Sequence, residues 1–466
     1  MRSVGKGSVL LGALVVRPDL SSSYTATTSP SSQQCSPVSL LLQLLSWLTD
    51  LLQLLIHLTR TILVFTPCVL SCPLLLLPGP ARPVGPLLQL LVSSLETAGP
   101  VYIKLGQWAS TRRDLFSVEV CRALGRLQTR VAPHSWAATS AALDRELGPG
   151  WREQLTVDPA VAGSGCCAQV HRGQLEGVGA VAVKVVHPGL AARLALDLQL
   201  LSAAARLLET VLPSLAWIAL PTAVQEFGRL MEDQLDLRRE ANNLRIFRHN
   251  FRGQSGLQFP EPVAGWSEYR EVLVEEWVEG ESLDSLLEGG GSARERCRLA
   301  GLGVSMLLQM VFTDNCWHGD LHPGNLLVTR QGRLCVLDAG IAGSLAVPDR
   351  QNLLETFRAI VLGESGRVGE LFLERSNHSC QDSAAFVREI QQIVDAARSA
   401  QLSLDRVDVT TLLQSVFSTL MRHQVRLDAN FSSVVIAIAI VEGLGRQLNP
   451  ELDLIQSAVP YIIKNQ

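Results

Sequence analysis

The sequence predicts an α+β chain with two lobes, preceded by helices of which one is strongly hydrophobic. Three observations support this prediction. A leucine-rich segment occupies residues 38–77, short β-type runs surround a glycine turn at 161–186, and a polar loop with a short apolar strand follows at 318–340. We expect the strand-rich part to form an ATP-binding half that precedes the polar loop.

The composition excludes some classes of protein. The chain has 466 residues, enough for one large domain with extensions. Lys and Arg total 40 against 44 Asp and Glu, so there is no basic excess to neutralise phosphates, and we expect no nucleic-acid partner. The ten cysteines form no C-x-x-C pair, which indicates reduced thiols and argues against secretion.

Residues 1–36 resemble a targeting segment more than part of a folded domain. Arg2, Lys6 and Arg17 are balanced only by Asp19, and a Ser/Thr-rich run follows. A basic, serine-rich and acid-poor start is typical of mitochondrial transit peptides. Two alternatives remain open, namely a secretory signal with residues 9–16 as its apolar core and a disordered tail with no targeting function.

Residues 37–81 form a hydrophobic segment that we expect to be membrane-associated. A helix from Ser39 to about Phe65 would be about 40 Å long, and Pro67 is expected to end it. Such a helix either lies in the bilayer interface or turns its polar side toward a partner inside the membrane, and a buried helix of a soluble domain is the alternative. Its polar residues, spaced 3, 4, 3, 4, 3, would form one narrow stripe: Gln43, Ser46, Asp50, Gln53, His57 and Arg60.

The sharpest chemical signal is the run from His318 to Asn325, followed by the strand-like Leu334–Leu337 and then Asp338. An Asp followed five residues later by Asn, and then by an Asp at the end of a strand, is typical of phosphotransferases. We expect Asp320 to act on the acceptor hydroxyl, and Asn325 with Asp338 to bind Mg²⁺. Hard oxygen ligands on rigid elements suit this ion.

An upstream half that binds ATP is also predicted. The turn of Gly163, Ser164 and Gly165 lies between two strand-like runs and would bring backbone N–H groups to the phosphates. Lys184, on a third strand, would neutralise the α- and β-phosphates. This lysine needs a carboxylate from a helix, for which Glu240 is the candidate.

The segment Gly99–Arg112 contains Lys104, Gly106 and Gln107, and with the motifs above it resembles the KxGQ signature of the UbiB (aarF-domain) family of atypical kinases. The resemblance extends from Gly99 to the C-terminus. It implies a protein-kinase-like fold with a KxGQ extension at 82–135, an N-lobe with a helical insert at 136–278 and a C-lobe at 279–466. It also implies ATP and Mg²⁺ as cofactors, and a mitochondrial membrane setting, by expectation the inner membrane. A lipid or quinone precursor and the proteins of coenzyme Q biosynthesis are the partners that it implies.

The resemblance places further residues in the nucleotide site. Lys104 and Gln107 share one helix face and would point into it. Backbone groups of Glu275, Glu276 and Trp277 would bind adenine. The family's E-x-D is here Gln234-Leu235-Asp236, so Lys104 would face one acid where most relatives offer two. The D-F-G triplet is Asp338-Ala339-Gly340, which keeps the acid and loses the aromatic ring.

Three features argue against a conventional protein kinase. Gly319 replaces the Arg that would bind an activation-loop phosphate, and His322 replaces the usual lysine. Only residues 341–347 separate Gly340 from the next helix, too few for a platform for a protein substrate. We therefore expect an atypical kinase or ATPase acting near a lipid. The alternatives are a catalytically silent, membrane-anchored scaffold and a small-molecule kinase of the choline or aminoglycoside type.

Overall fold

The computed structural model describes residues 37–76, 83–127, 131–288, 290–374, 376–378, 380–402 and 409–464. The chain divides into two compact units, Met1–Ile56 and His57–Gln466, which are described separately. The predicted targeting segment, residues 1–36, lies outside the described residues, as do 77–82 at the end of the predicted hydrophobic segment.

The hydrophobic segment is one helix, α1 (Pro37–Ser71), followed by a 3₁₀ turn, η2 (Cys72–Leu76). The prediction that Pro67 ends the helix is wrong, because the helix continues through it for another turn. A proline so close to the end deprives only the carbonyl of Leu63 of its helical donor, a small loss beside that of a break in mid-helix. Within the described residues, the 24 residues Leu51–Leu74 are long and apolar enough to cross a membrane, with a mean hydropathy of 1.6.

The predicted polar stripe contacts the protein's own helices where α1 belongs to the second unit. His57 Nε2 lies 2.7 Å from Oδ1 of Asp197 on α6 (Leu190–Val211), and Arg60 donates to the carbonyl of Thr97 on α2 (Val84–Ala98) at 3.0 Å. Ile62 on the same helix is 56% exposed. His57 and Arg60 of the stripe are thus bound by this chain, and the apolar Ile62 is left uncovered.

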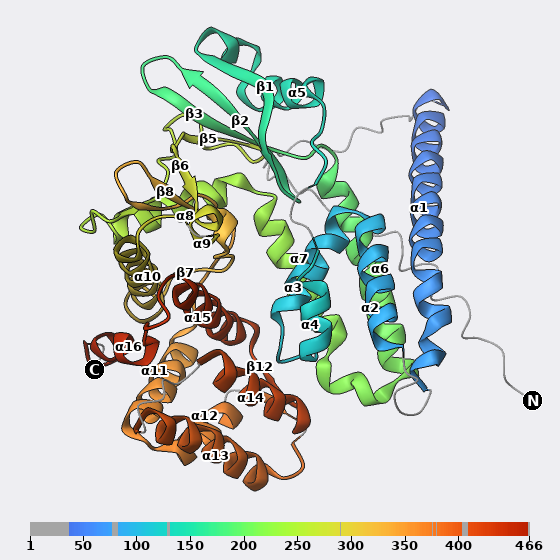
Figure 1. The fold of residues 1–466 in the computed structure, drawn as a ribbon. Coiled ribbons are helices and arrows are strands. Elements are labelled where there is room, and N and C mark those ends of the chain that lie inside the picture. The colour runs from blue at the N-terminus through green and yellow to red at the C-terminus, as the bar shows by residue number, and fades with distance from the viewer. Residues whose placement is uncertain are drawn as a thin grey trace, which may run out of the picture. The chain divides into compact units, whose positions relative to one another are not determined.

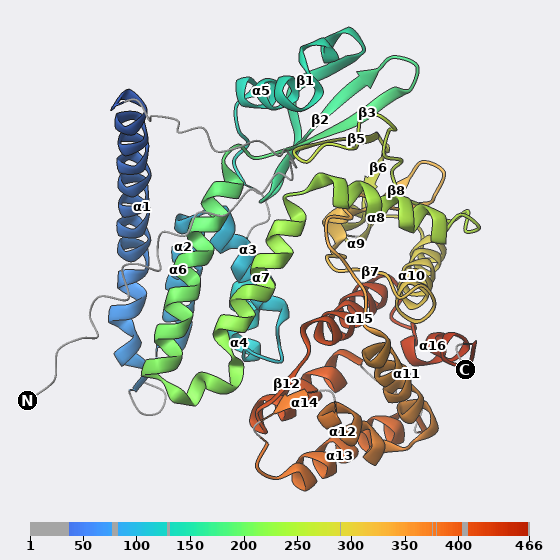
Figure 2. The same ribbon diagram turned by 180° about the vertical axis from the view of Figure 1, so that it is seen from behind.

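The helical extension consists of α2, α3 (Pro100–Thr111) and α4 (Val118–Leu124). Two helices inserted into the N-lobe, α6 and α7 (Leu220–Gln234), are joined by the 3₁₀ turn η5 (Pro213–Ile218) and run beside this extension in Figures 1 and 2. Val101 and Leu105 of α3 pack against Phe227 and Met231 of α7, so α3 is fixed to the insert by apolar contacts.

The N-lobe is an antiparallel sheet in the order β1-β2-β3-β5. The strand, turn, strand and lysine-bearing strand predicted from the sequence are all present. Alternation along β3 buries Val181, Val183 and Val185 on one face and leaves Lys184 on the other. The elements of this lobe are α5 (Trp136–Leu147), η4 (Pro149–Glu153), β1 (Leu155–Ser164), β2 (Ala168–Leu175), β3 (Gly179–Val186), α8 (Leu237–Asn250) and β5 (Val272–Glu276).

Short strands at the top of the C-lobe hold the polar loop. One small sheet has the order β4-β9-β8-β6, and another pairs β10 with β7. The polar loop runs from the end of β7 to the start of β8, and Asp338 follows β9, as the sequence predicted. These elements are β4 (Leu257–Gln258), β6 (Gly280–Ser282), β7 (Trp317–His318), η7 (Pro323–Asn325), β8 (Leu326–Thr329), β9 (Leu334–Val336) and β10 (Ala342–Gly343).

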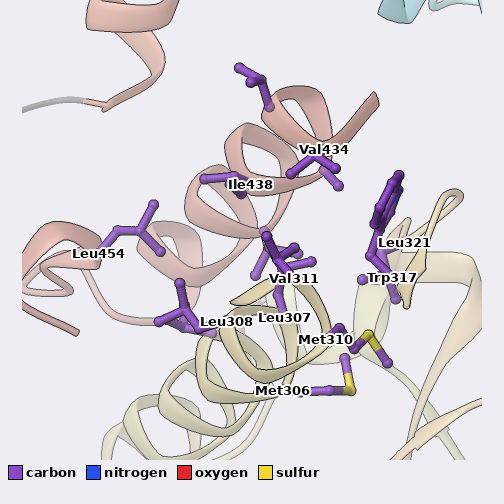
Figure 3. Close-up of a cluster of buried hydrophobic side chains, with 14 of the residues drawn as sticks. Met306, Leu307, Leu308, Met310, Val311, Trp317, Leu321, Val434, Ile438 and Leu454 are labelled. Atoms are coloured by element: carbon purple, nitrogen blue, oxygen red, sulfur yellow. The ribbon is translucent and has the colours of Figure 1, made fainter. Parts of the chain in front are cut away.

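The rest of the C-lobe is helical and has the largest apolar core of the described residues. Figure 3 shows Val434 and Ile438 of α15 beside Leu307 and Val311, with Trp317 close by. Within the described residues, Asn430–Leu448 of α15 is also long and apolar enough to cross a membrane, but 61% of this window is buried, as in a core helix. The elements are α9 (Leu283–Leu287), α10 (Ala293–Leu308), the π-helical turn η6 (Gln309–Thr313), α11 (Val347–Leu362), α12 (Ser365–Glu374), β11 (Ser376–His378), α13 (Ser383–Leu402), α14 (Val409–Arg422), β12 (Val425–Leu427), α15 (Ala429–Leu448) and α16 (Leu454–Lys464).

Candidate active site

One continuous cavity of about 2020 Å³ lies between the two lobes and the KxGQ extension. Ligand pockets typically measure about 300–1,000 Å³, so this cavity has room for a nucleotide and a second molecule. All the residues that the sequence placed in the site line it: Lys104, Gln107, Gly163, Ser164, Gly165, Lys184, Glu240, Glu276, Trp277, Asp320, Asn325 and Asp338.

Lys184 is the centre of a buried cluster of charges. Its Nζ donates to both carboxylate oxygens of Glu240 at 2.7 Å and lies 3.4 Å from Oδ2 of Asp338. Glu240 is in the first turn of α8, which begins where Asp236 caps it, and its side chain is only 2% exposed. Burial raises the pKa of Glu240 to about 7 in spite of the ammonium group beside it.

Asp338 is held in place from two sides. Its Oδ1 accepts from the backbone N–H of Gly340 at 2.8 Å, and its Oδ2 faces Lys184. Burial opposes ionisation of this carboxyl, but Lys184 and the N–H of Gly340 outweigh it, and the pKa of Asp338 lies well below its usual range. Asn243 of α8, which sequence reasoning missed, donates to the carbonyl of Ala339 at 2.8 Å and ties the Asp338 loop to the N-lobe.

Asp320 is paired with a lysine of the extension in this structure. Lys104 Nζ lies 3.1 Å from its Oδ2, and the two side chains are 14% and 35% exposed. Burial acts against both charges, yet each stabilises the other, so the pKa of Lys104 is raised and that of Asp320 is lowered. The KxGQ extension thus places its lysine on the carboxylate predicted to act on the acceptor.

His318 connects the backbones of Asp320 and Asp338. The N–H of Asp320 donates to Nδ1 of His318 at 3.1 Å, and Nε2 of His318 donates to the carbonyl of Asp338. These contacts require a neutral ring protonated on Nε2, and burial lowers the pKa of His318 accordingly. His318 begins the polar-loop motif, but the sequence analysis assigned no role to it. The only available signal was its place two residues before Asp320.

The donor atoms near Asp338 fit a magnesium ion that is bound together with phosphates. Asn325 donates through Nδ2 to the carbonyl of Asp320 at 3.0 Å, which orients its amide oxygen as a ligand. Mg²⁺ is usually held by one or two carboxylates plus substrate phosphates, and less often by an all-protein cage. Asn325 and Asp338 would supply such a partial set. No group of three or more His, Cys, Asp or Glu side chains that could hold a metal occurs among the described residues.

The glycine turn differs from the prediction in one respect. Gly163, Ser164 and Gly165 line the cavity, but the N–H of Gly165 donates to the carbonyl of Ala168 at 2.9 Å. It therefore cannot donate to a phosphate, because it closes the β1–β2 hairpin. Ser164 Oγ is buried without a hydrogen-bond partner in the described part of the chain.

Two of the backbone donors predicted to bind adenine, those of Glu276 and Trp277, are occupied in the structure. The N–H of Glu276 donates to the carbonyl of Glu261 at 2.8 Å, and that of Trp277 donates to Ala180 at 3.2 Å. Both donors extend the sheet of the N-lobe and are not available to a base. Glu275, which was expected to contribute only backbone groups, also lines the cavity at this point.

The expected partners of the extension are different in the structure. Asp236 is not the partner of Lys104, because its carboxylate caps α8 and binds Arg238. Gln234 Oε1 accepts from Cys167 Sγ at 3.8 Å, so Gln234 contacts the glycine turn, and Lys104 pairs with Asp320. Gln107 lines the cavity as predicted and donates to the carbonyl of Leu127 at 3.4 Å.

The two lobes and the site between them define an atypical kinase-like protein. The chain matches the ABC1 atypical kinase-like domain over residues 126–372 and the UbiB helical domain over residues 391–453. It belongs to the ABC1/UbiB family of atypical kinases, as its motifs indicated. A kinase-like domain implies nucleotide binding. The predicted domain boundaries stay predictions.

Known relatives include proteins of mitochondria and bacteria. The chain is 30% identical to a mitochondrial ABC1 family protein of Schizosaccharomyces pombe, over 86% of this chain and 69% of that protein. It is 31% identical to a mitochondrial ABC1 family protein of Saccharomyces cerevisiae, over 80% and 67%, and to "Probable protein kinase UbiB" of Vibrio cholerae, over 80% and 69%. Among solved structures, the Rv3197–erythromycin complex of Mycobacterium tuberculosis aligns over 84% of this chain and 97% of that one, at 20% identity and a TM-score of 0.44.

Proposed function

We propose that this protein is an ATP- and Mg²⁺-dependent atypical kinase or ATPase that acts on a small molecule at a membrane. The observation that supports it best is the arrangement around Lys184, whose ammonium joins Glu240 of the N-lobe to Asp338 of the C-lobe. A lysine held by a helical carboxylate, facing an Asp at the end of a strand, is the arrangement that binds nucleotide phosphates in kinases.

The roles of the side chains follow from their contacts. Lys184 would bind the α- and β-phosphates, and Glu240 would position it. Asn325 and Asp338 would hold Mg²⁺, which neutralises charge on the phosphates when it is bound. Asp320 would accept the proton of the acceptor hydroxyl, whose oxygen bonds to the γ-phosphorus while the bond from that phosphorus to the β–γ bridging oxygen breaks.

Lys104 would restrain this chemistry. While it binds Asp320, that carboxylate is stabilised in its charged form and is a poor proton acceptor. Turnover then requires α3 to move or its lysine to change partner. The same contact favours a second candidate function, a scaffold that binds nucleotide without turning it over.

ATP turnover by the purified protein separates the two candidates. Asp338→Asn should abolish turnover, because the amide loses the charge that binds the metal. Asp349→Asn, in the first turn of α11, is the matched control and should turn over ATP at the wild-type rate. Nucleotide binding with no turnover in the wild type and in variants of Lys104 would identify the scaffold.

The setting that we propose is a mitochondrial membrane, by expectation the inner one. The mitochondrial relatives and the exposed apolar face of α1 support it. Within the family, the Gln234-Leu235-Asp236 variant, the Gly163–Cys166 turn and the Asp338-Ala339-Gly340 triplet resemble the vertebrate aarF domain-containing protein kinase 2. The acceptor class that we propose is a lipid or quinone precursor, in support of coenzyme Q or lipid metabolism and together with its biosynthetic proteins. Mitochondria carrying Asp338→Asn should accumulate that precursor.

A further inference from the structure

Glu275 is a buried acid in the wall of the active-site cavity. Its side chain is 7% exposed, and its Oε2 has no hydrogen-bond partner in the described part of the chain. The neighbouring Glu276 differs, because its carboxylate accepts from Gln258 Nε2 at 3.1 Å and from the backbone N–H of Glu261 at 3.3 Å. An unpaired buried polar group is costly, so a cavity-lining one is expected to bind a ligand.

The strand register places Glu275 between the phosphate end of the site and the connection of the lobes. Glu275 lies opposite Ala182 in the β3–β5 pair, and Lys184 lies opposite Leu273. Opposite residues and residues two apart share one face of a sheet, so Glu275, Ala182 and Lys184 all face the cavity. At about 3.3 Å per residue, Glu275 is about 7 Å along the sheet from Lys184.

The charges around Glu275 favour its neutral form. The charges of Glu240, Asp338 and Glu276 act against its ionisation, and the cation that favours it, Lys184, already binds Glu240. Burial raises the pKa of Glu275 well above its usual value, and Glu240 raises it further. A neutral carboxyl group has one O–H donor and one carbonyl acceptor side by side.

The surroundings of Glu275 suit a flat heterocycle. Val170 and Ala182 line the cavity from the N-lobe sheet, and Leu327 lines it from the C-lobe, so apolar side chains are available for both faces of a ring. A nucleotide whose phosphates lie at Lys184 would direct its base toward this part of the cavity. We propose that Glu275 is a specificity residue that binds the amino edge of adenine, accepting from the exocyclic amino group and donating to the neighbouring ring nitrogen. This inference rests on the proposed function, because it requires a nucleotide in the cavity.

Two nucleotides and three variants test this assignment. ATP and purine riboside triphosphate, which lacks the exocyclic amino group, are titrated into the wild-type protein, Glu275→Leu and Glu275→Gln. We expect the wild type to prefer ATP and Glu275→Leu to reduce that preference by about tenfold, the value of one or two neutral hydrogen bonds. Glu275→Gln should retain most of the preference, because an amide also has one donor and one acceptor side by side. Lys184→Met is the control, and should weaken both nucleotides by the same factor.

Each outcome has a definite meaning. An unchanged preference for ATP in Glu275→Leu, with its thermal unfolding cooperative, would overturn the assignment and leave the proposed function standing. A wild-type protein that binds both nucleotides equally would do the same. Failure of the wild type to bind either nucleotide would overturn the proposed function and this assignment together.

Discussion

Replacing Lys104 by methionine tests whether the KxGQ extension restrains the active site. At 3.1 Å and an effective dielectric constant of about 20, the charges of Lys104 and Asp320 attract each other by about 5 kcal/mol. Lost hydration offsets most of this attraction, because Lys104 is 14% and Asp320 35% exposed. We take the net strength of the pair as about 1–2 kcal/mol, between that of surface and fully buried pairs.

That strength sets the expected effect on catalysis. If the pair must open before Asp320 can accept a proton, Lys104→Met should raise the rate of ATP turnover about five- to thirtyfold. Lys104→Arg keeps the charge and should leave the rate low. The rates are measured by phosphate release at saturating ATP. A Lys104→Met variant with unchanged or slower turnover would refute the restraint and make the lysine part of the catalytic step.

Three further predictions concern the charge cluster and α1. Burial raises the folded-state pKa of Glu240 from 4.5 to about 7, so between these pH values the folded state binds more protons than the unfolded state. The free energy of unfolding should therefore fall by about 3 kcal/mol as the pH rises from 4.5 to 7. The free energy of unfolding is measured in urea at pH 5 and pH 7.5, and Glu240→Gln should remove the difference between the two. The same loss of stability with rising pH in both proteins would contradict the prediction. Lys184→Met should lower the apparent affinity for ATP, measured by thermal stabilisation, at least tenfold, since the phosphates lose their counter-charge. Stabilisation by ATP equal to that of the wild type would remove Lys184 from the site. Replacing the exposed Ile62 and Leu63 of α1 by serine should lower liposome binding about tenfold or more, whereas Val347→Ser, at an equally exposed site, should not.

The sequence predicted most of the N-lobe strands and the polar loop and short strand of the C-lobe because those features are local. Alternation around Lys184 and the apolar run before Asp338 each define a strand within a few residues. The pairing of Lys184 with Glu240 was also predicted, because the chemistry of phosphate binding requires a carboxylate and the helix after Asp236 offers one.

What the sequence missed depends on contacts between distant segments. Lys104 and Asp320 are 216 residues apart, and the choice of Asp320 over Asp236 follows only when α8 has used Asp236 as its cap. The backbone donors at Glu276 and Trp277 are used by neighbouring strands, which no local pattern indicates. That Glu275 Oε2 has no hydrogen-bond partner likewise depends on how the sheet, α8 and the C-lobe pack together, which no local pattern indicates.

The central claim, a magnesium–nucleotide site at Lys184, Asn325 and Asp338, is tested most directly by calorimetric titration of ATP with and without Mg²⁺. We predict that Mg²⁺ strengthens ATP binding to the wild-type protein, and that Asp338→Asn removes this gain while Asp349→Asn keeps it. ATP binding of equal strength with and without Mg²⁺, or a gain that Asp338→Asn leaves unchanged, would contradict the claim.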